Sequence, residues 1–163
     1  MSEVGTVPAV RCALVTGSTE VDQHHGIRHE VFVTEFAIFS DTDRDQLDGR
    51  PTTLKGLGFC GEVPAGTVRL YPTSDDGTEW LGDRLAVLAL YRRRHLGAPL
   101  VDFAVSTAAE RGGHRMTAHI QLGNVPFFES LGWSADGPVE TYVGLPHQPM
   151  AIDVRRRAAE LGR

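Results

Sequence analysis

Cysteine, lysine and long apolar runs are all scarce in this chain of 163 residues. The two cysteines, Cys12 and Cys60, lie far apart and lack the spacing of metal ligands, which argues against a disulfide scaffold or a zinc module. No segment approaches the roughly 18 consecutive apolar residues of a membrane span, and no charged-then-apolar leader opens the chain. We therefore expect one reduced, cytoplasmic domain that has no membrane partner.

Positive charge comes almost entirely from arginine, since Lys55 is the only lysine. The formal net charge of −5 argues against nucleic acid as a dedicated partner. Three arginines nevertheless stand together at Arg92, Arg93 and Arg94, and His95 follows them. Guanidinium groups gathered at one point of an acidic chain favour a compact anion site, although a solvated face gives the same pattern.

The alternation of apolar and turn residues predicts an α+β fold in a single domain. Residues 1–10 form a lead, residues 11–150 form the domain, and residues 151–163 form a polar tail with a short helix. The expected strands cover residues 11–15, 54–62, 66–71, 84–89, 116–121 and 141–143, and the expected helices cover residues 22–36, 97–111 and 124–131.

The segment after the fourth expected strand carries the most chemistry. Pro99 is tolerated only in the first turn of a helix, which places the helix start near Gly97, and Gly112 and Gly113 end that helix. A buried strand at 84–89 thus runs through the arginine turn into a helix N-terminus, where unpaired N–H groups and the helix dipole attract anions. The glycines of a P-loop or a dinucleotide fingerprint are missing, so a phosphate-bearing cofactor would bind in a loop of another kind.

This order of strand, basic loop and helix resembles the acetyl-CoA-binding motif of the GNAT N-acetyltransferases. The family pattern is Gln/Arg-x-x-Gly-x-Gly/Ala, and the best match is Arg92-Arg-Arg-His-Leu-Gly97, in which His95 replaces the first glycine. A second segment, Asn124-Val-Pro-Phe-Phe-Glu-Ser-Leu-Gly-Trp133, resembles the short helix that follows in the family. The resemblance covers residues 11–150 and implies a central mixed, mostly antiparallel sheet flanked by helices, with a splayed parallel strand pair.

A narrower resemblance points to a bacterial branch, the nitrogen-starvation N-acetyltransferases. That label implies a reaction class and a physiological setting but no substrate. The segments that carry it are the aspartate-rich loop at 41–48, Arg28-His-Glu-Val-Phe-Val33, Gly66-Thr-Val-Arg-Leu-Tyr71, Gly82-Asp-Arg-Leu-Ala-Val87 and Gly144-Leu-Pro-His-Gln-Pro-Met150.

The resemblance implies acetyl-CoA as the co-substrate and no metal. The pantetheine arm would pair with the strand at 84–89, where a backbone N–H near Val87 or Leu88 would polarise the thioester carbonyl. The pyrophosphate would lie on the N–H groups of residues 93–98. The cofactor-binding residues implied in this way are Leu85, Ala86, Val87, Arg92, Arg93, Arg94, His95, Leu96, Gly97, Ala98, Asn124, Phe127 and Phe128.

The implied reaction is direct attack of a small-molecule primary amine on the acetyl group, which requires a base and delivery of a proton to the leaving thiolate. The usual acid of the family is a tyrosine on the short helix, but the matching residue is Phe128, which cannot donate a proton. Either the thiolate leaves unprotonated or another group protonates it. Tyr91 and Tyr142 are candidates that the sequence does not place.

Three residues are candidates for the catalytic base. Glu79 and Asp83 precede the expected cofactor strand, where several family members keep their base, although most carboxylates in such loops are solvated. His147 would return to the site if the last strand pairs as the resemblance implies, and a loop histidine is the alternative.

The acceptor side is assigned from the first helix and the loop that follows it. Arg28 and Phe32 are the candidate substrate-binding residues. The aspartates of the 41–48 loop do not match a calcium-binding loop, because glycine and the bidentate glutamate are missing. We expect a flexible acidic loop near the substrate entrance that attracts a cationic amine.

Two other functions stay open. The acyl-homoserine-lactone synthases share the implied fold, and Arg28-x-x-Val-Phe and Gly66-x-x-Arg-Leu-x-Pro72 resemble them, but those enzymes take acyl groups from a carrier protein. A CoA-binding regulatory protein without catalysis is the other alternative, because the acid tyrosine is missing. The family resemblance also allows a homodimer.

Overall fold

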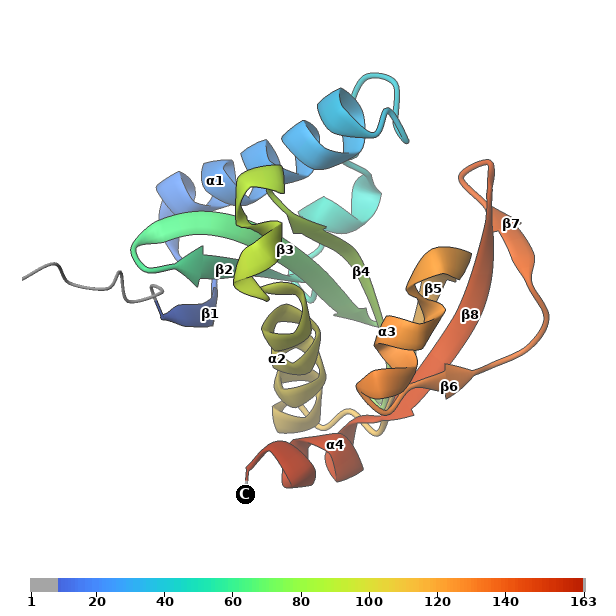
Figure 1. The fold of residues 1–163 in the computed structure, drawn as a ribbon. Coiled ribbons are helices and arrows are strands. Elements are labelled where there is room, and N and C mark those ends of the chain that lie inside the picture. Colours follow the sequence, from blue (N-terminus) through green and yellow to red (C-terminus); the bar gives the residue numbers. More distant parts are fainter. Residues whose placement is uncertain (1–8, 163) are drawn as a thin grey trace, which may run out of the picture.

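The computed structural model describes residues 9–162, which form a mixed eight-stranded sheet and four α-helices (Figure 1). The sheet order is β1-β2-β3-β4-β5-β8-β6, and β7 pairs with β8. The strands are β1 (Val10–Leu14), β2 (Leu54–Cys60), β3 (Val63–Pro72), β4 (Glu79–Val87), β5 (Arg115–Gln121), β6 (Ser134–Ala135), β7 (Glu140–Tyr142) and β8 (Leu145–Asp153). The α-helices are α1 (Gly17–His29), α2 (Gly97–Glu110), α3 (Val125–Ser130) and α4 (Val154–Leu161).

The sheet consists of two antiparallel halves that meet at one parallel joint. Strands β1 to β4 pair antiparallel in chain order, and β5 pairs antiparallel with β8. Parallel strands need a crossover, and α2 supplies it between β4 and β5. This α+β arrangement agrees with the predicted fold class.

Helices cover both faces of the first half of the sheet. Helix α1 lies on one face and α2 on the other (Figure 1). On α2 the apolar residues Leu100, Ala104, Val105 and Ala108 are buried in the main core. Burying a leucine side chain of this kind stabilises the fold by about 1.5–3 kcal/mol, so the apolar stripe of α2 fixes the helix against the sheet.

The predicted helix start at Gly97 is confirmed, and Gly112 adopts the positive φ of 90° that ends such a helix. The first helix begins at Gly17, five residues earlier than predicted, and continues as a π-helix over Glu30–Glu35. The predicted break between the strands at 54–62 and 66–71 lies too late in the chain. The chain turns instead at Gly61, which has a φ of 61°, and β3 has already begun at Val63.

Strand β4 also differs from its prediction, because it begins at Glu79 and not at residue 84. Its first half pairs with both β3 and β5, and these tertiary contacts override a segment whose glycine and charges are typical of a loop. Asp83 therefore lies inside a central strand. At the other end of the domain, β8 runs on to Asp153, so the predicted boundary between residues 150 and 151 falls within a strand.

Helix α4 packs against α2. Arg157 Nε donates a hydrogen bond of 3.0 Å to Asp102 Oδ1 on α2, so an ion pair ties the predicted polar tail to the domain. No helix within residues 9–162 is long and apolar enough to cross a membrane.

Candidate functional site

A pocket opens where β4 and β5 separate. The two strands pair over only three residues each, Glu79–Leu81 with Arg115–Thr117, and then diverge (Figure 1). A cavity of about 170 Å³ occupies the gap. Strand β4 contributes Gly82 to Leu85, and the other walls comprise Phe32, Ile38, Phe39, Val68, Val101, Ala104, Met116, Ala118, His119, Ile120, Gln121, Asn124, Phe128, Trp133, Tyr142, Val143 and His147.

A β-bulge in β4 lies at this gap. The register between β3 and β4 shifts between Thr67 and Arg69, and Arg84 takes the left-handed conformation with a φ of 52°. The hydroxyl of Thr67 donates to the Arg84 carbonyl at 2.8 Å and holds the irregular backbone in place. A bulge bends its strand and increases the local twist, which accounts for the divergence of β4 from β5.

The end of β4 offers one of the two backbone donors expected from the sequence. The Leu88 N–H donates to the Ala65 carbonyl at 2.8 Å, so it is not available to a ligand. Because successive N–H groups of a strand point to opposite sides, the N–H of Val87 points away from β3 and toward the gap. The Val87 carbonyl accepts a hydrogen bond of 3.1 Å from Arg92 Nε, which ties the loop to the strand end.

The loop after β4 delivers the chain to the N-terminus of α2. A 3-10 helix over Ala89–Arg94 leads to His95, which has the left-handed angles φ 57° and ψ 43°. His95 therefore adopts the conformation that the glycine of the family pattern would adopt without strain. The first turn of α2 has no side-chain cap, which leaves the N–H groups of Gly97 and Ala98 without a helical partner.

The three loop arginines are not equivalent. Arg92 Nη1 donates a 2.6 Å hydrogen bond to Glu35, and the guanidinium lies 5.0 Å from the ring centre of Phe36. The hydrogen bond from Arg92 lowers the pKa of Glu35. Arg92 is thus engaged with the end of the first helix, and its assignment to the cofactor stays a prediction. Arg93 and Arg94 are exposed at the same loop.

Some of the predicted cofactor residues on and just before α3 line the pocket and others do not. Asn124 lines the pocket, and Phe128 is buried in its wall with its ring edge-on to Trp133 at 5.4 Å. Phe127 lies outside the pocket lining and is partly exposed. On β4, Leu85 lines the pocket, whereas Ala86 is buried in the core beneath α1.

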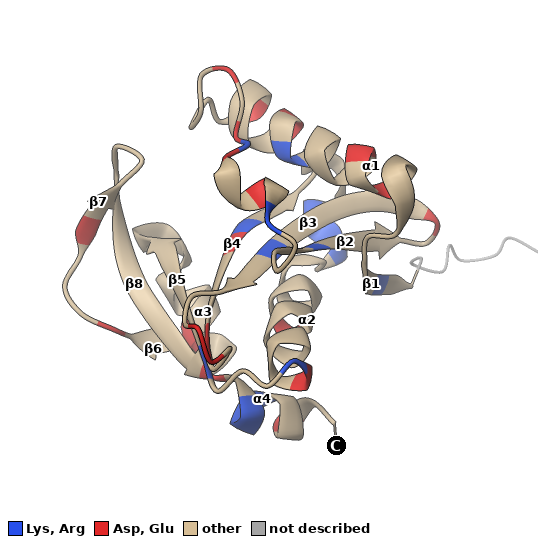
Figure 2. Cartoon of the chain, turned by 180° about the vertical axis from the view of Figure 1, so that it is seen from behind, with Lys and Arg blue, Asp and Glu red and all other residues tan. Residues whose placement is uncertain are grey.

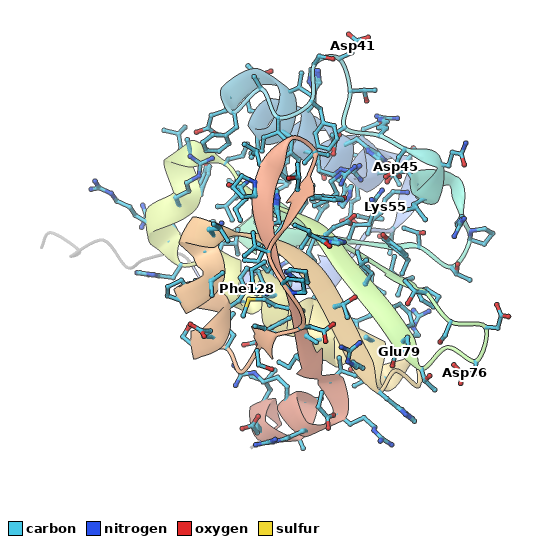
Figure 3. All side chains as sticks on the ribbon, turned by 90° about the vertical axis from the view of Figure 1, so that its right-hand side faces the viewer. Asp41, Asp45, Lys55, Asp76, Glu79 and Phe128 are labelled. Carbon is cyan, nitrogen blue, oxygen red and sulfur yellow. The ribbon has the colours of Figure 1, made fainter. Side chains whose placement is uncertain are left out.

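The three predicted bases lie in different environments. Glu79 lies beside Asp76 at the end of β4 remote from Asp45, and its Oε1 is 3.2 Å from Arg115 Nη1 (Figure 3). Because Glu79 does not line the pocket, its assignment as the base is not supported. Asp83 and His147 do line the pocket. His147 is 4% exposed, and its Nδ1 is 2.9 Å from the Leu145 carbonyl.

Residues 64–154 match the family model described as an acetyltransferase (GNAT) domain, a match that spans more than half of the chain. The chain belongs to this GNAT acetyltransferase family. By its family it is therefore an N-acetyltransferase. The acetyl donor that GNAT enzymes use is acetyl-CoA. The narrower resemblance to the nitrogen-starvation branch stays a prediction.

Other relatives of this GNAT protein agree with that family. BSU40680 of Bacillus subtilis (strain 168), which is named as an acetyltransferase, is 28% identical over 138 residues, or 82% of this chain and 89% of that protein. A crystal structure described as an N-acetyltransferase from Lactobacillus plantarum has a TM-score of 0.79 at 22% identity, covering 90% of this chain and 99% of the other. A CoA-dependent acyl-homoserine lactone synthase, BjaI, has a TM-score of 0.72 at 20% identity, covering 86% and 79%. The last two likenesses show the GNAT fold.

The aspartate-rich loop of this GNAT domain is bound into a buried network of ion pairs. Its members, which we call the arginine–aspartate network, are Arg28, Arg69, Arg84, Asp43, Asp45, Asp48 and Asp83. Arg28 is 0% exposed, and its Nε donates a 2.6 Å bond to Asp43. Arg28 does not line the pocket, so the structure corrects its assignment to substrate binding. Phe32, the other candidate, does line it.

Paired charges also correct the expectation of a free acidic loop. Arg69 bridges Asp45 and Asp83 at 2.7 Å each, and Arg84 Nε lies 3.1 Å from Asp43. Burial opposes ionisation of Asp48, but the hydrogen bond and charge of Arg28 outweigh it and lower the pKa of that carboxyl. Figure 2 shows the acidic and basic segments side by side where the loop meets β3 and β4.

One pocket residue and the carboxylate that contacts it were missed by the sequence reasoning, and a third residue was not placed by it. They are His119 on β5, Glu140 on β7, and Tyr142, which was a candidate acid without a position. His119 and Tyr142 line the pocket, and Glu140 contacts His119. The alternation of buried Ala118 and Ile120 with His119 predicts that the histidine lies on the other face of the strand, but only the pairing of β5, β8 and β7 brings the three together.

Proposed function

We propose that this GNAT enzyme transfers the acetyl group of acetyl-CoA to a small-molecule primary amine by direct attack. One observation carries the proposal: the gap between β4 and β5 forms a pocket that reaches Asn124, on the segment leading into α3. Free backbone donors flank this pocket at Val87 and at the start of α2. A thioester could enter the gap with its phosphates on the arginine loop.

The residues present fit such a co-substrate. The uncapped N–H groups of Gly97 and Ala98, with the exposed Arg93 and Arg94, would hold the pyrophosphate. The Val87 N–H would hydrogen-bond the thioester oxygen, a contact that strengthens as negative charge develops there. Bound acetyl-CoA supplies the activated acetyl group, and the chain supplies binding, orientation and carbonyl polarisation.

The family pattern does not identify the residues that transfer protons in this reaction. Phe128 offers no proton, and a thiol pKa near 8.5 lets the thiolate leave without an acid. Of the predicted bases, Asp83 and His147 line the pocket. Asp83 accepts two hydrogen bonds from Arg69, at 2.7 and 2.8 Å, so both of its oxygens are already engaged.

The test combines calorimetry with a thiol-release assay. Titration with CoA measures binding, and a panel of aromatic, aliphatic, amino-acid and polyamine acceptors with acetyl-CoA measures release of free thiol. We expect binding and thiol release with at least one class of amine. Absence of CoA binding at millimolar concentration would reject the proposed function.

The second candidate function is acyl-homoserine-lactone synthesis. The structural likeness to BjaI supports it. Because that synthase is described as CoA-dependent, an acyl-carrier protein is not the only donor in this group of enzymes, and CoA binding alone does not separate the two functions. The solved BjaI complex contains SAM and isopentyl-CoA. Incubation of the protein with SAM and this acyl-CoA, followed by mass spectrometry for an acylated lactone, separates them.

The non-catalytic alternative has its own signature. Such a protein would bind CoA in the calorimeter but release no thiol above the background hydrolysis of acetyl-CoA with any amine. The missing acid at Phe128 is the observation that supports it. These two measurements therefore separate a non-catalytic protein from the two enzymes, and the incubation with SAM separates the two enzymes from each other.

A further inference from the structure

A histidine, a carboxylate and a tyrosine meet on the sheet face that borders the acceptor side of the pocket. His119 lies on β5 beyond the last residue that pairs with β4. The antiparallel pairing places it opposite Pro149 of β8, and His147, two residues away on β8, lies opposite Glu140 of β7. Directly paired residues and residues two apart share one face of a sheet, so these side chains converge.

The contacts give His119 a fixed orientation. Its Nδ1 lies 2.6 Å from Glu140 Oε1, an ion-pair distance without the alignment of a hydrogen bond, and its ring stacks on Tyr142 with 4.4 Å between ring centres and 6° between ring planes. The Nδ1 atom is buried, whereas the side chain as a whole is 29% exposed and lines the pocket. The exposed edge of the ring is therefore the edge that carries Nε2.

We propose that His119 is the catalytic base of this acetyl transfer and that Glu140 is its positioning residue. The inference rests on the proposed function, since it needs an amine acceptor in the pocket. The negative charge of Glu140 beside Nδ1 favours a proton on that nitrogen, which leaves the lone pair of Nε2 facing the acceptor. A carboxylate behind the imidazole stabilises the charged ring that forms when Nε2 takes a proton.

The proton and bond changes balance with no further reactant. The acceptor enters as an ammonium ion and gives one proton to His119 Nε2. Its nitrogen then forms the C–N bond to the acetyl carbon while the C–S bond breaks, and the sulfur keeps the electron pair. The nitrogen loses its second proton to the departing thiolate, which becomes free CoA thiol, and His119 returns its proton to solvent.

The other ionisable groups at the pocket are less suited to this step. Asp83 and Arg84 face His119 from β4, but both are engaged in the arginine–aspartate network. His147 is almost fully buried and touches Tyr142 edge-on at 5.3 Å. On the strand of His119 itself, Arg115 lies four residues away on the same face and pairs with Glu79 and Asp136.

The first test is the pH profile of kcat/KM with an amine identified in the acceptor panel. The variants are H119Q and E140Q, and H114Q is the matched control because His114 is exposed and does not line the pocket. We expect H119Q to lower kcat roughly 100-fold or more and to abolish the acid limb that follows imidazole protonation. We expect E140Q to keep that limb and to lower kcat less than H119Q does, because the imidazole remains but the neutral amide no longer favours a proton on Nδ1. An H119Q profile that matches wild type would overturn the proposal.

A second measurement needs no acceptor amine. It therefore tests the assignment of His119 separately from the proposed function. Long-range ¹⁵N NMR reports which ring nitrogen of a neutral histidine carries the proton, and H119Q identifies the signal. We expect His119 to carry its proton on Nδ1 in the wild type and to lose that preference in E140Q, with His114 unchanged. If no amine is acetylated, the proposed function fails by itself. A wild-type His119 protonated on Nε2 overturns the assignment of His119 whichever amines react.

Discussion

His24, a buried histidine of α1, makes the folding stability depend on pH. Substitution of this one residue measures its contribution. His24 is 0% exposed, its Nδ1 lies 3.0 Å from the Gly56 carbonyl, and its Nε2 lies 3.2 Å from Arg28 Nη1. A carbonyl only accepts and a guanidinium only donates, so the folded ring must be neutral with its proton on Nδ1. Burial, followed by the charge of Arg28, lowers the pKa of His24 to about 3.

The sign and size of the effect follow from linkage. In the unfolded chain the pKa of a histidine is about 6.5, so between pH 6.5 and about 3 the unfolded state binds a proton that the folded state rejects. Stability is unaffected by His24 above pH 6.5 and falls below it by about 1.4 kcal/mol per pH unit. Between pH 7 and pH 5 the loss from His24 is therefore about 2 kcal/mol.

Other groups add losses of the same sign in adjoining windows. Burial lowers the pKa of His25 to about 4, so the folding stability also falls because of His25 as the pH drops below 6.5. Asp48 and Asp45 have lowered pKa values because of their hydrogen bonds and charges with Arg28 and Arg69, and their contributions are lost only below about pH 4. The interval from pH 7 to pH 5 therefore isolates the histidines.

The assay is urea unfolding followed by circular dichroism at pH 7 and pH 5, with H24N and the control H29N. His29 is exposed on the same helix and should leave the pH dependence of wild type intact. H24N should be less stable at pH 7 by about 1–2 kcal/mol, because its amide cannot make both ring contacts. The difference between pH 7 and pH 5 should nevertheless shrink by about 2 kcal/mol. An undiminished difference in H24N would refute the neutral buried state of His24.

Three further outcomes are expected. D43N leaves two buried guanidinium groups without their shared negative charge and should lower the unfolding free energy by about 3–5 kcal/mol in urea titrations, whereas D41N, at an exposed position, should change it little. The double variant R93A/R94A should weaken CoA binding by about 2–3 kcal/mol in calorimetry, and unchanged affinity would contradict their placement at phosphate. H95G should raise stability by up to about 1 kcal/mol in thermal unfolding, because glycine tolerates a φ of 57°.

Local sequence signals predicted the elements that local chemistry decides. Helix α2 begins at Gly97 as expected, because Pro99 is restricted to a first turn whatever surrounds it. The start of β4 depends instead on partners: Trp80 is buried, and a Cβ added to Gly82 would lie 3.1 Å from Met116 Sδ. A glycine that resembles a turn signal in the sequence is thus a close contact between strands in the fold.

The arginine–aspartate network could not have been predicted from spacing. Arg28 and Asp43 lie 15 residues apart, and Arg84 and Asp43 lie 41 apart, so no local motif links them. Each aspartate alone is typical of a solvated loop, which is why the loop was expected to be free and to attract a cation. To predict that these aspartates are paired, one must know which arginines are buried beside them. Only the packing of α1 on the sheet determines this.

Arg84 connects the fold to the chemistry of the pocket. Its left-handed backbone forms the bulge at which β4 leaves β5, and its side chain binds the Asp43 carbonyl at 2.8 Å. The same guanidinium lies 4.8 Å from the ring centre of Phe39, which is a wall of the pocket. A buried charge paired in this way adds little net stability, because desolvation offsets the attraction. Its effect is geometric: the loop that carries Phe39 is held against the strand whose bulge opens the gap, so Arg84 links two walls of the pocket.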